Sequence, residues 1–278
     1  MLKQRIITAV LLLVVLLPAL FAAALWPFAL LVLLMIGAAG WEWGRLNGLG
    51  SGAALALGGL IAAGGLAAYA LGWPDLAQGG AWWFATAAWV LGGAWILRRG
   101  VAGWPALSPS LRWLLGAVLL WGVWLAMVAA KARGVNFLLS VFTLVWAADI
   151  AAYFGGRAFG RRKLAPAISP GKSWEGVWSG MVGVLVLAAA WIALDRFTGQ
   201  SVSSLYSQLL ERLGFVGLAV ALLFLTAMSV VGDLFESLVK RSAGAKDSSA
   251  LLPGHGGVLD RIDALLPVFP LALALCSL

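Results

Sequence analysis

The chain has 278 residues, of which 63% are apolar and 11% are charged, whereas soluble domains contain about 45–50% apolar and about 25% charged residues. This composition excludes a soluble globular protein and indicates a protein that lies in a lipid bilayer. The formal charge of +8 fits loops that set membrane topology and contact anionic headgroups or substrates, so we expect no nucleic acid partner. The single cysteine, Cys276, excludes a disulfide framework and a multi-cysteine metal site.

Runs of about 20 apolar residues predict membrane-spanning helices along the whole chain. The first run has the basic start of a signal peptide, but a second apolar run follows at once near Trp26 and favours two membrane helices. We therefore expect an all-α, polytopic membrane protein with about nine transmembrane helices. They are expected at residues 6–24, 27–43, 53–72, 81–97, 113–130, 135–155, 177–195, 214–236 and 262–278. Three of these runs are short, so eight or ten helices are also compatible with the sequence.

No linker divides the chain into soluble domains, which predicts a single integral membrane unit over residues 1–278. Within it, residues 1–130 form N-terminal helices, and residues 131–278 form the helices and cytoplasmic loops that carry the chemistry. If the N-terminus is cytoplasmic and nine spans alternate, fifteen of the 19 Lys and Arg residues face the cytoplasm and four face the other side. The positive-inside rule predicts this asymmetry. We expect a multi-pass protein of the cell (inner) membrane, with its N-terminus and its active site at the cytoplasmic face.

Acidic residues at the end of the eighth span, in GDLFESLVKR, are the first sign of a functional site. Asp and Glu contribute little to orientation and are expensive at membrane depth, where they usually line a cavity or a site. Asp233, Glu236 or Ser237, and Lys240 fall on one face of a helix. A surface ion pair between Glu236 and Lys240 is a simpler interpretation of those two residues, but it leaves Asp233 unexplained.

Two further carboxyl groups begin the last span, in the sequence LDRID. Asp260 and Asp263 are spaced i, i+3 and therefore share a helix face. One of them could stabilise the N-terminus of the helix, whereas two of them near Asp233 indicate a metal site. Hard oxygen ligands favour Mg²⁺ or Mn²⁺ over zinc, and a second cation such as K⁺ is compatible with the same ligands.

The segment between these carboxyl groups combines cations with a glycine-rich loop, KDSSALLPGHGG. Its glycines permit a tight backbone whose N–H groups can approach phosphate oxygens. Together with carboxylates for Mg²⁺, such a loop has the parts of a nucleotide site. The single histidine, His255, is interpreted as a hydrogen-bonding loop residue or a phosphate contact rather than a proton-transfer group. The cations and glycines are Lys240, Arg241, Lys246, Gly254, Gly256 and Gly257.

A second charged loop covers residues 149–175 and contains the run SPGKS. Lys172 follows a glycine and lies beside serines, which makes it a candidate phosphate ligand. The same run could instead be only a turn in which Ser173 caps the next helix. The basic run Arg161–Lys163 could be purely topological.

The segment Ser237–Asp263 resembles the signature of phosphatidate cytidylyltransferases, also called CDP-diacylglycerol synthases. The family pattern consists of a Ser, Lys-Arg, Lys-Asp, His-Gly-Gly, Asp-Arg and a final Asp at fixed spacings. It is met here by Ser237, Lys240-Arg241, Lys246-Asp247, His255-Gly256-Gly257, Asp260-Arg261 and Asp263. The runs Ala39–Leu46 and Ser169–Gly176 also resemble the family and extend the likeness over nearly the whole chain. Family members often have Lys at the position of Gly171.

The resemblance implies that CTP reacts with phosphatidic acid to give CDP-diacylglycerol and pyrophosphate. It also implies a homodimer and a funnel that is open to both the cytoplasm and the lipid bilayer. A phosphomonoester carries about −1.5 to −2 charges near neutral pH, so the nucleophile needs no strong general base. The main requirement is to neutralise two anions and hold them in line.

These requirements assign roles to the charged residues. We expect Asp233 and Asp260 to be the principal Mg²⁺ ligands, with Asp263 and Asp247 completing or orienting the metal shell. The residues expected to act in catalysis are Asp233, Asp260, Lys240, Lys246 and Asp247. Those expected to bind substrate are Lys172, Ser169, Ser237, Arg241, His255, Gly256, Gly257 and Arg261.

Three other functions are compatible with parts of this pattern. A transporter would also explain intramembrane carboxyl groups, but it would not need Lys-Asp and His-Gly-Gly between them. An enzyme that joins CDP-diacylglycerol to an alcohol would carry a run of Asp-Gly, Ala-Arg and spaced Asp residues, which is not found here. A CTP-dependent polyprenol kinase would be distinguished by its substrate.

Overall fold

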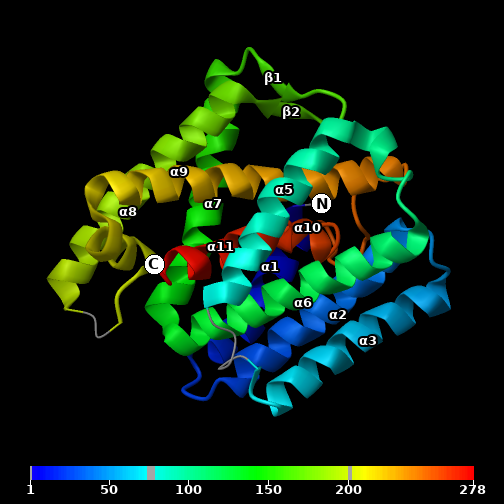
Figure 1. The fold of residues 1–278 in the computed structure, drawn as a ribbon, viewed down its shortest axis with the longest axis horizontal. Helices are drawn as coiled ribbons and strands as arrows, with labels where there is room; N and C mark the ends of the chain where they lie inside the picture. The colour runs from blue at the N-terminus through cyan, green and yellow to red at the C-terminus, as the bar shows by residue number, and fades with distance from the viewer. Residues whose placement is uncertain (1, 74–78, 200–201) are drawn as a thin grey trace.

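The computed structural model describes residues 2–73, 79–199 and 202–278, which form a bundle of helices with one small hairpin (Figure 1). In this part of the chain, seven helices are long and apolar enough to cross a membrane, which confirms an all-α polytopic membrane protein. The hairpin was not expected. The elements are α1 (Leu2–Phe21), α2 (Trp26–Leu46), α3 (Ser51–Ala70), α5 (Gly79–Gly103), α6 (Pro109–Arg133), α7 (Val135–Phe159), β1 (Lys163–Ala165), β2 (Ser169–Ser173), α8 (Trp174–Thr198), α9 (Leu205–Ser242), α10 (Leu259–Ile262) and α11 (Leu265–Leu275).

The last apolar run differs from the single helix that was expected over residues 262–278. It forms two helices, α10 of 4 residues and α11 of 11 residues, which meet at Asp263 and Ala264. Proline lacks a backbone N–H and distorts a helix, and α11 contains Pro267 near its start and Pro270 in its interior. At 1.5 Å per residue α11 is only about 17 Å long.

α11 is the centre of the bundle. All residues from 265 to 274 are buried, and the helix packs against α5, α6, α7 and α9. A helix that is apolar on every side is suited to such a position. The apolar end of the sequence therefore forms the core against which the charged segment before it is held.

α9 crosses the bundle in Figure 1 and carries much of the charged motif. The helix is broken at Gly214, whose φ of 68° favours glycine, and it continues past the expected end at residue 236 to Ser242. Gly232 allows a backbone contact beside Asp233, because a Cβ there would lie 2.5 Å from the carbonyl oxygen of Asp263. α9 and the junction of α10 with α11 are thus in close contact where both carry acidic residues.

The second charged loop folds into the hairpin, in which β1 pairs with β2 in antiparallel fashion. Glu175 closes its base by accepting hydrogen bonds from the backbone N–H groups of Arg161 and Arg162, at 3.0 and 3.1 Å. Ser173 caps α8, because its Oγ accepts the N–H of Gly176 at 3.2 Å. The predicted cap at Ser173 is therefore confirmed, although the run Ser169–Ser173 is a strand rather than only a turn.

The start of α1 lies at the same end of the bundle as the charged loops. Thr8 Oγ1 donates a hydrogen bond to the carbonyl oxygen of Pro253 at 3.0 Å. The N-terminal helix and the glycine-rich loop are therefore on one side of the molecule.

Candidate functional site

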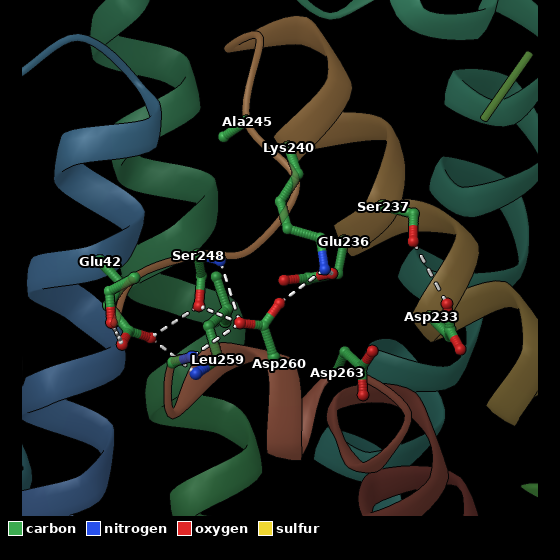
Figure 2. A network of polar contacts seen from close by, with 12 residues as sticks. Glu42, Asp233, Glu236, Ser237, Lys240, Ala245, Ser248, Leu259, Asp260 and Asp263 are labelled. Carbon is green, nitrogen blue, oxygen red and sulfur yellow. Dashed lines mark hydrogen bonds and ion pairs between the residues drawn. The ribbon is translucent and has the colours of Figure 1, made fainter. Parts of the chain in front are cut away.

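Lys240 is the centre of a buried ionic cluster (Figure 2). Its Nζ lies 2.5 Å from Glu236 Oε2 and 2.6 Å from Asp260 Oδ1. The Glu236 side chain is 1% exposed and that of Lys240 is 11% exposed. The interpretation of these two residues as a surface pair is therefore wrong, because the pair is buried and also includes Asp260.

Asp260 has partners on both of its carboxyl oxygens. Oδ1 contacts Lys240, and Oδ2 accepts the N–H groups of Ser248 and Gly257 at 3.0 and 2.8 Å and the hydroxyl of Ser248 at 2.8 Å. The ammonium group of Lys240 and the donors of Gly257 and Ser248 compensate this carboxyl group for the cost of its burial. Asp260 is thus held as a carboxylate.

The glycine-rich loop is a tight turn. Leu252 and Gly256 form an isolated bridge, and the N–H of His255 donates to the carbonyl of Leu252 at 2.8 Å. Gly254 and Gly256 have φ values of 79° and 81°, which explains why glycine is needed at these two positions. The N–H of Gly257 donates to Asp260 rather than pointing into open space.

The two charged loops meet at an ion pair. Lys172 Nζ lies 2.7 Å from Asp233 Oδ2, and Ser237 Oγ donates to Asp233 Oδ1 at 3.3 Å. Arg241 makes a second connection, since its Nε donates to the carbonyl of Ile168 at 3.3 Å. Lys172 of the second charged loop therefore contacts the end of α9.

Two pockets adjoin the cluster and share no lining residue. The first, of about 470 Å³, lies between α7, β2, α8 and α9 and is lined by Ser169, Lys172 and Asp233 together with several apolar side chains. The second, of about 600 Å³, is lined by the glycine-rich turn. It includes Lys246, Asp247, His255, Gly256 and Arg261. Some of the predicted site residues therefore line two separate pockets, one partly apolar and one polar, whereas Lys240, Asp260 and Asp263 line neither.

The chemistry of the donor set suits a divalent cation, although the described residues do not form a closed metal cage. Within residues 2–73, 79–199 and 202–278, no group of three or more His, Cys, Asp or Glu side chains is arranged to hold a metal ion. The available donors are hard carboxyl oxygens, and Glu236 Oε1 is buried without a hydrogen-bond partner in this part of the chain. Lys172 and Lys240 pair with Asp233 and Asp260, the two expected principal ligands.

The sequence interpretation missed two acidic residues. Asp149, on α7, lines the first pocket beside Lys172 and Asp233. Glu42, on α2, is fully buried and contacts the segment that precedes Asp260. The signal was present in both cases, because an acidic residue within an apolar run is costly in a membrane unless it has a specific partner.

Comparison of the sequence with known proteins assigns the chain to a family. Residues 3–278 match the model of the Cytidylyltransferase family. The chain is 41% identical over 99% of its length to a phosphatidate cytidylyltransferase of Pseudomonas aeruginosa, covering 97% of that protein. It is 54% identical over 50% of its length to one of Haemophilus influenzae, a match that spans 44% of that relative, and 39% identical over 52% to one of Bacillus subtilis, spanning 49%. The chain belongs to the cytidylyltransferase family, and the resemblance of its charged motif to phosphatidate cytidylyltransferases is confirmed.

Proposed function

We propose that the protein transfers the cytidylyl group of CTP to phosphatidic acid at the charged end of the bundle, giving CDP-diacylglycerol and pyrophosphate. The observation that carries this proposal is the contact of Lys172 with Asp233, which joins the two charged loops at 2.7 Å. The relatives named phosphatidate cytidylyltransferase support it, above all the one matched over nearly its full length.

The reaction makes one P–O bond and breaks another. A phosphate oxygen of phosphatidic acid attacks the α-phosphorus of CTP, and the bond from this phosphorus to the oxygen that bridges to the β-phosphate breaks. Pyrophosphate leaves with that oxygen. The attacking phosphomonoester carries about −1.5 to −2 charges near neutral pH, so no side chain has to remove a proton. The protein has to bind two anions, reduce their repulsion and hold them in line.

The two pockets suit the two substrates. In this proposal the lipid phosphate binds in the first pocket at Lys172 and Ser169, where apolar side chains from α7 and α8 can meet the start of the acyl chains. The triphosphate binds in the second pocket, where Lys246 and Arg261 supply positive charge beside the glycine-rich turn. The cluster around Lys240 would then lie where the two phosphate groups approach each other.

A divalent cation is part of this proposal. Asp233 and Asp260, with Asp263 and Asp247, would hold Mg²⁺ or Mn²⁺, and a second cation such as K⁺ could use the same carboxyl groups. When bound, such an ion neutralises phosphate charge and makes the α-phosphorus more electrophilic. Lys240 and Lys172 would then be available to orient phosphate oxygens.

We place the N-terminus and the site at the cytoplasmic face of the cell (inner) membrane. The contact of Thr8 with Pro253 supports a common side for both, and the excess of Lys and Arg on that side supports the cytoplasm. In this orientation α1 and the α10–α11 segment complete nine membrane segments with the seven long helices. We also propose a homodimer, which the family resemblance implies.

Transfer of labelled CMP tests the proposed function. Purified protein in dioleoyl phosphatidate micelles is incubated with radiolabelled CTP and either Mg²⁺ or EDTA. We expect label to enter the lipid fraction with Mg²⁺ and not with EDTA. Label that stays in water, together with ion-driven uptake by protein-containing liposomes, would favour a transporter. Transfer of phosphate from γ-labelled CTP to a polyprenol would indicate a kinase instead.

A further inference from the structure

Glu42 binds a segment that lies more than 200 residues later in the chain. Its Oε1 accepts the hydroxyl of Ser249 at 2.5 Å and the N–H of Val258 at 3.0 Å. Its Oε2 accepts the N–H of Leu259 at 2.7 Å and the hydroxyl of Ser248 at 3.2 Å. The Glu42 side chain is fully buried, so its carboxyl oxygens meet these four donors rather than bulk water.

The helix that carries Glu42 is firmly held at this point. The neighbouring Trp43 stacks on Phe235 of α9, with ring centroids 6.0 Å apart, and meets Trp104 edge-on at 5.7 Å. Trp43 Nε1 also donates to the carbonyl of Arg112 on α6 at 2.9 Å. Because these contacts hold α2 in place, Glu42 can anchor the segment 248–259. Loops of this kind are in general more mobile than helices.

Ser248 and Gly257 connect Glu42 to Asp260 (Figure 2). Ser248 Oγ lies within 3.2 Å of Glu42 and 2.8 Å of Asp260. Gly257 donates its N–H to Asp260, and a Cβ on this residue would lie 2.4 Å from Glu42 Oε1 and 2.0 Å from Ser248 Oγ. The side chain of Ser248 thus bridges the two carboxyl groups. Gly257 lies against both of them, and a larger residue could replace it only if its neighbours moved.

We propose that Glu42 is a positioning residue for the nucleotide: it fixes the segment 248–259, and thereby the glycine-rich turn and Asp260, for binding CTP. This inference rests on the proposed function and on the second pocket as the nucleotide site. Ser249 lines that pocket, and none of the four partners of Glu42 lines the first pocket. We therefore expect Glu42 to affect the binding of CTP rather than that of the lipid substrate.

Glu42→Gln is the sharpest test because it keeps the size of the side chain. Each carboxyl oxygen accepts one backbone N–H, from Val258 or from Leu259, so an amide NH₂ in place of either oxygen faces an N–H donor and loses that hydrogen bond. Oε1 also accepts the Ser249 hydroxyl, and Oε2 shares the hydroxyl proton of Ser248 with Asp260. We expect the apparent KM for CTP to rise about tenfold or more, and the KM for phosphatidic acid to stay within about twofold. Hydrogen exchange at the Val258 and Leu259 amides should become faster.

Asp195→Asn is the matched control. Asp195 lies near the far end of α8 and accepts hydrogen bonds from Asn136, Ser204 and Ser207. The change is likewise from a carboxyl to an amide among several donors. It should lower the thermal midpoint while leaving the KM for CTP and the exchange at Val258 and Leu259 unchanged.

The outcomes separate this inference from the proposed function. A wild-type protein that transfers no CMP contradicts the proposed function, and hydrogen exchange in Glu42→Gln still decides whether Glu42 fixes the loop. An active wild type with an unchanged KM for CTP in Glu42→Gln overturns the positioning role, as does an equal effect of Asp195→Asn. If Glu42→Gln does not fold, Ser249→Ala removes one of the four donors, and an unchanged KM for CTP in that variant overturns the inference.

Discussion

Lys240 Nζ lies 2.6 Å from Asp260 Oδ1, so a cation near the end of α9 contacts a carboxyl group on α10 that follows it by 20 residues. The contact closes the loop that contains the glycine-rich turn. In the same way, Lys172 connects the other charged loop to α9 by pairing with Asp233. Two lysines therefore bring both charged loops to one end of α9, and this arrangement leads to the following predictions.

Removal of the ammonium group of Lys240 should affect both folding and catalysis. Lys240→Met leaves Glu236 and Asp260 without their shared cation, and breaking a buried ion pair costs about 3–5 kcal/mol. We expect a lower thermal midpoint and a loss of at least about 100-fold in CMP transfer. The matched control is Lys131→Met, because Lys131 is also buried but its ammonium group donates to a neutral acceptor, the carbonyl of Ala22, at 3.2 Å. Equal activity of these two variants would contradict a role of Lys240 in the reaction.

A methyl group at Gly257 should disrupt the site. A Cβ there would approach Ser248 Oγ to 2.0 Å and Glu42 Oε1 to 2.4 Å, and overpacking of this kind costs about 1–3 kcal/mol. Gly257→Ala should therefore lose CMP transfer and accelerate hydrogen exchange in the segment 248–259. Gly59→Ala, on α3, is the control because nothing lies within 4 Å of its added Cβ. Full activity of Gly257→Ala would show that the close approach has no function.

Lys172→Gln should weaken the use of phosphatidic acid more than that of CTP. The substitution removes one of the two cations that line the first pocket among the described residues, the one that pairs with Asp233. We expect the KM for phosphatidic acid to rise about tenfold, measured at saturating CTP. A double-mutant cycle with Asp233→Asn measures the coupling of the pair. A KM change confined to CTP would assign the pockets the other way round.

Gly171→Lys should improve binding of the lipid phosphate. Gly171 lines the first pocket, and nothing lies within 4 Å of a Cβ at this position. An added cation beside Lys172 should lower the KM for phosphatidic acid by about two- to fivefold at low ionic strength, and less at high salt. Gly171→Gln controls for the added side chain without charge. The same KM in both variants would exclude an electrostatic effect.

The sequence predicted the class of the fold because apolar length alone identifies membrane helices. It could not predict that the last apolar run splits into α10 and α11, since this depends on how Pro267 and Pro270 pack inside the bundle. The hairpin β1–β2 was missed for a related reason. Its strands have 3 and 5 residues and are too short for a clear alternating pattern.

The site was predictable where the motif is continuous and missed where partners are distant. Asp233, Lys240 and Asp260 were identified from their spacing near the end of the chain, and the structure pairs Lys240 with Asp260 and Asp233 with Lys172. Glu42 could not be assigned a role, because its partners follow it by 206 to 217 residues. The assignment of metal and substrate roles to individual residues stays a prediction.

The central claim is that the carboxyl group of Asp260 is part of a site that transfers CMP to phosphatidic acid. The most direct test is label transfer from CTP to lipid by Asp260→Asn. Asp195→Asn, near the C-terminal end of α8, is the control because it makes the same change from a carboxyl group to an amide. We predict at least about 100-fold less transfer by Asp260→Asn in folded protein and near wild-type transfer by Asp195→Asn. Wild-type transfer by Asp260→Asn would contradict the account.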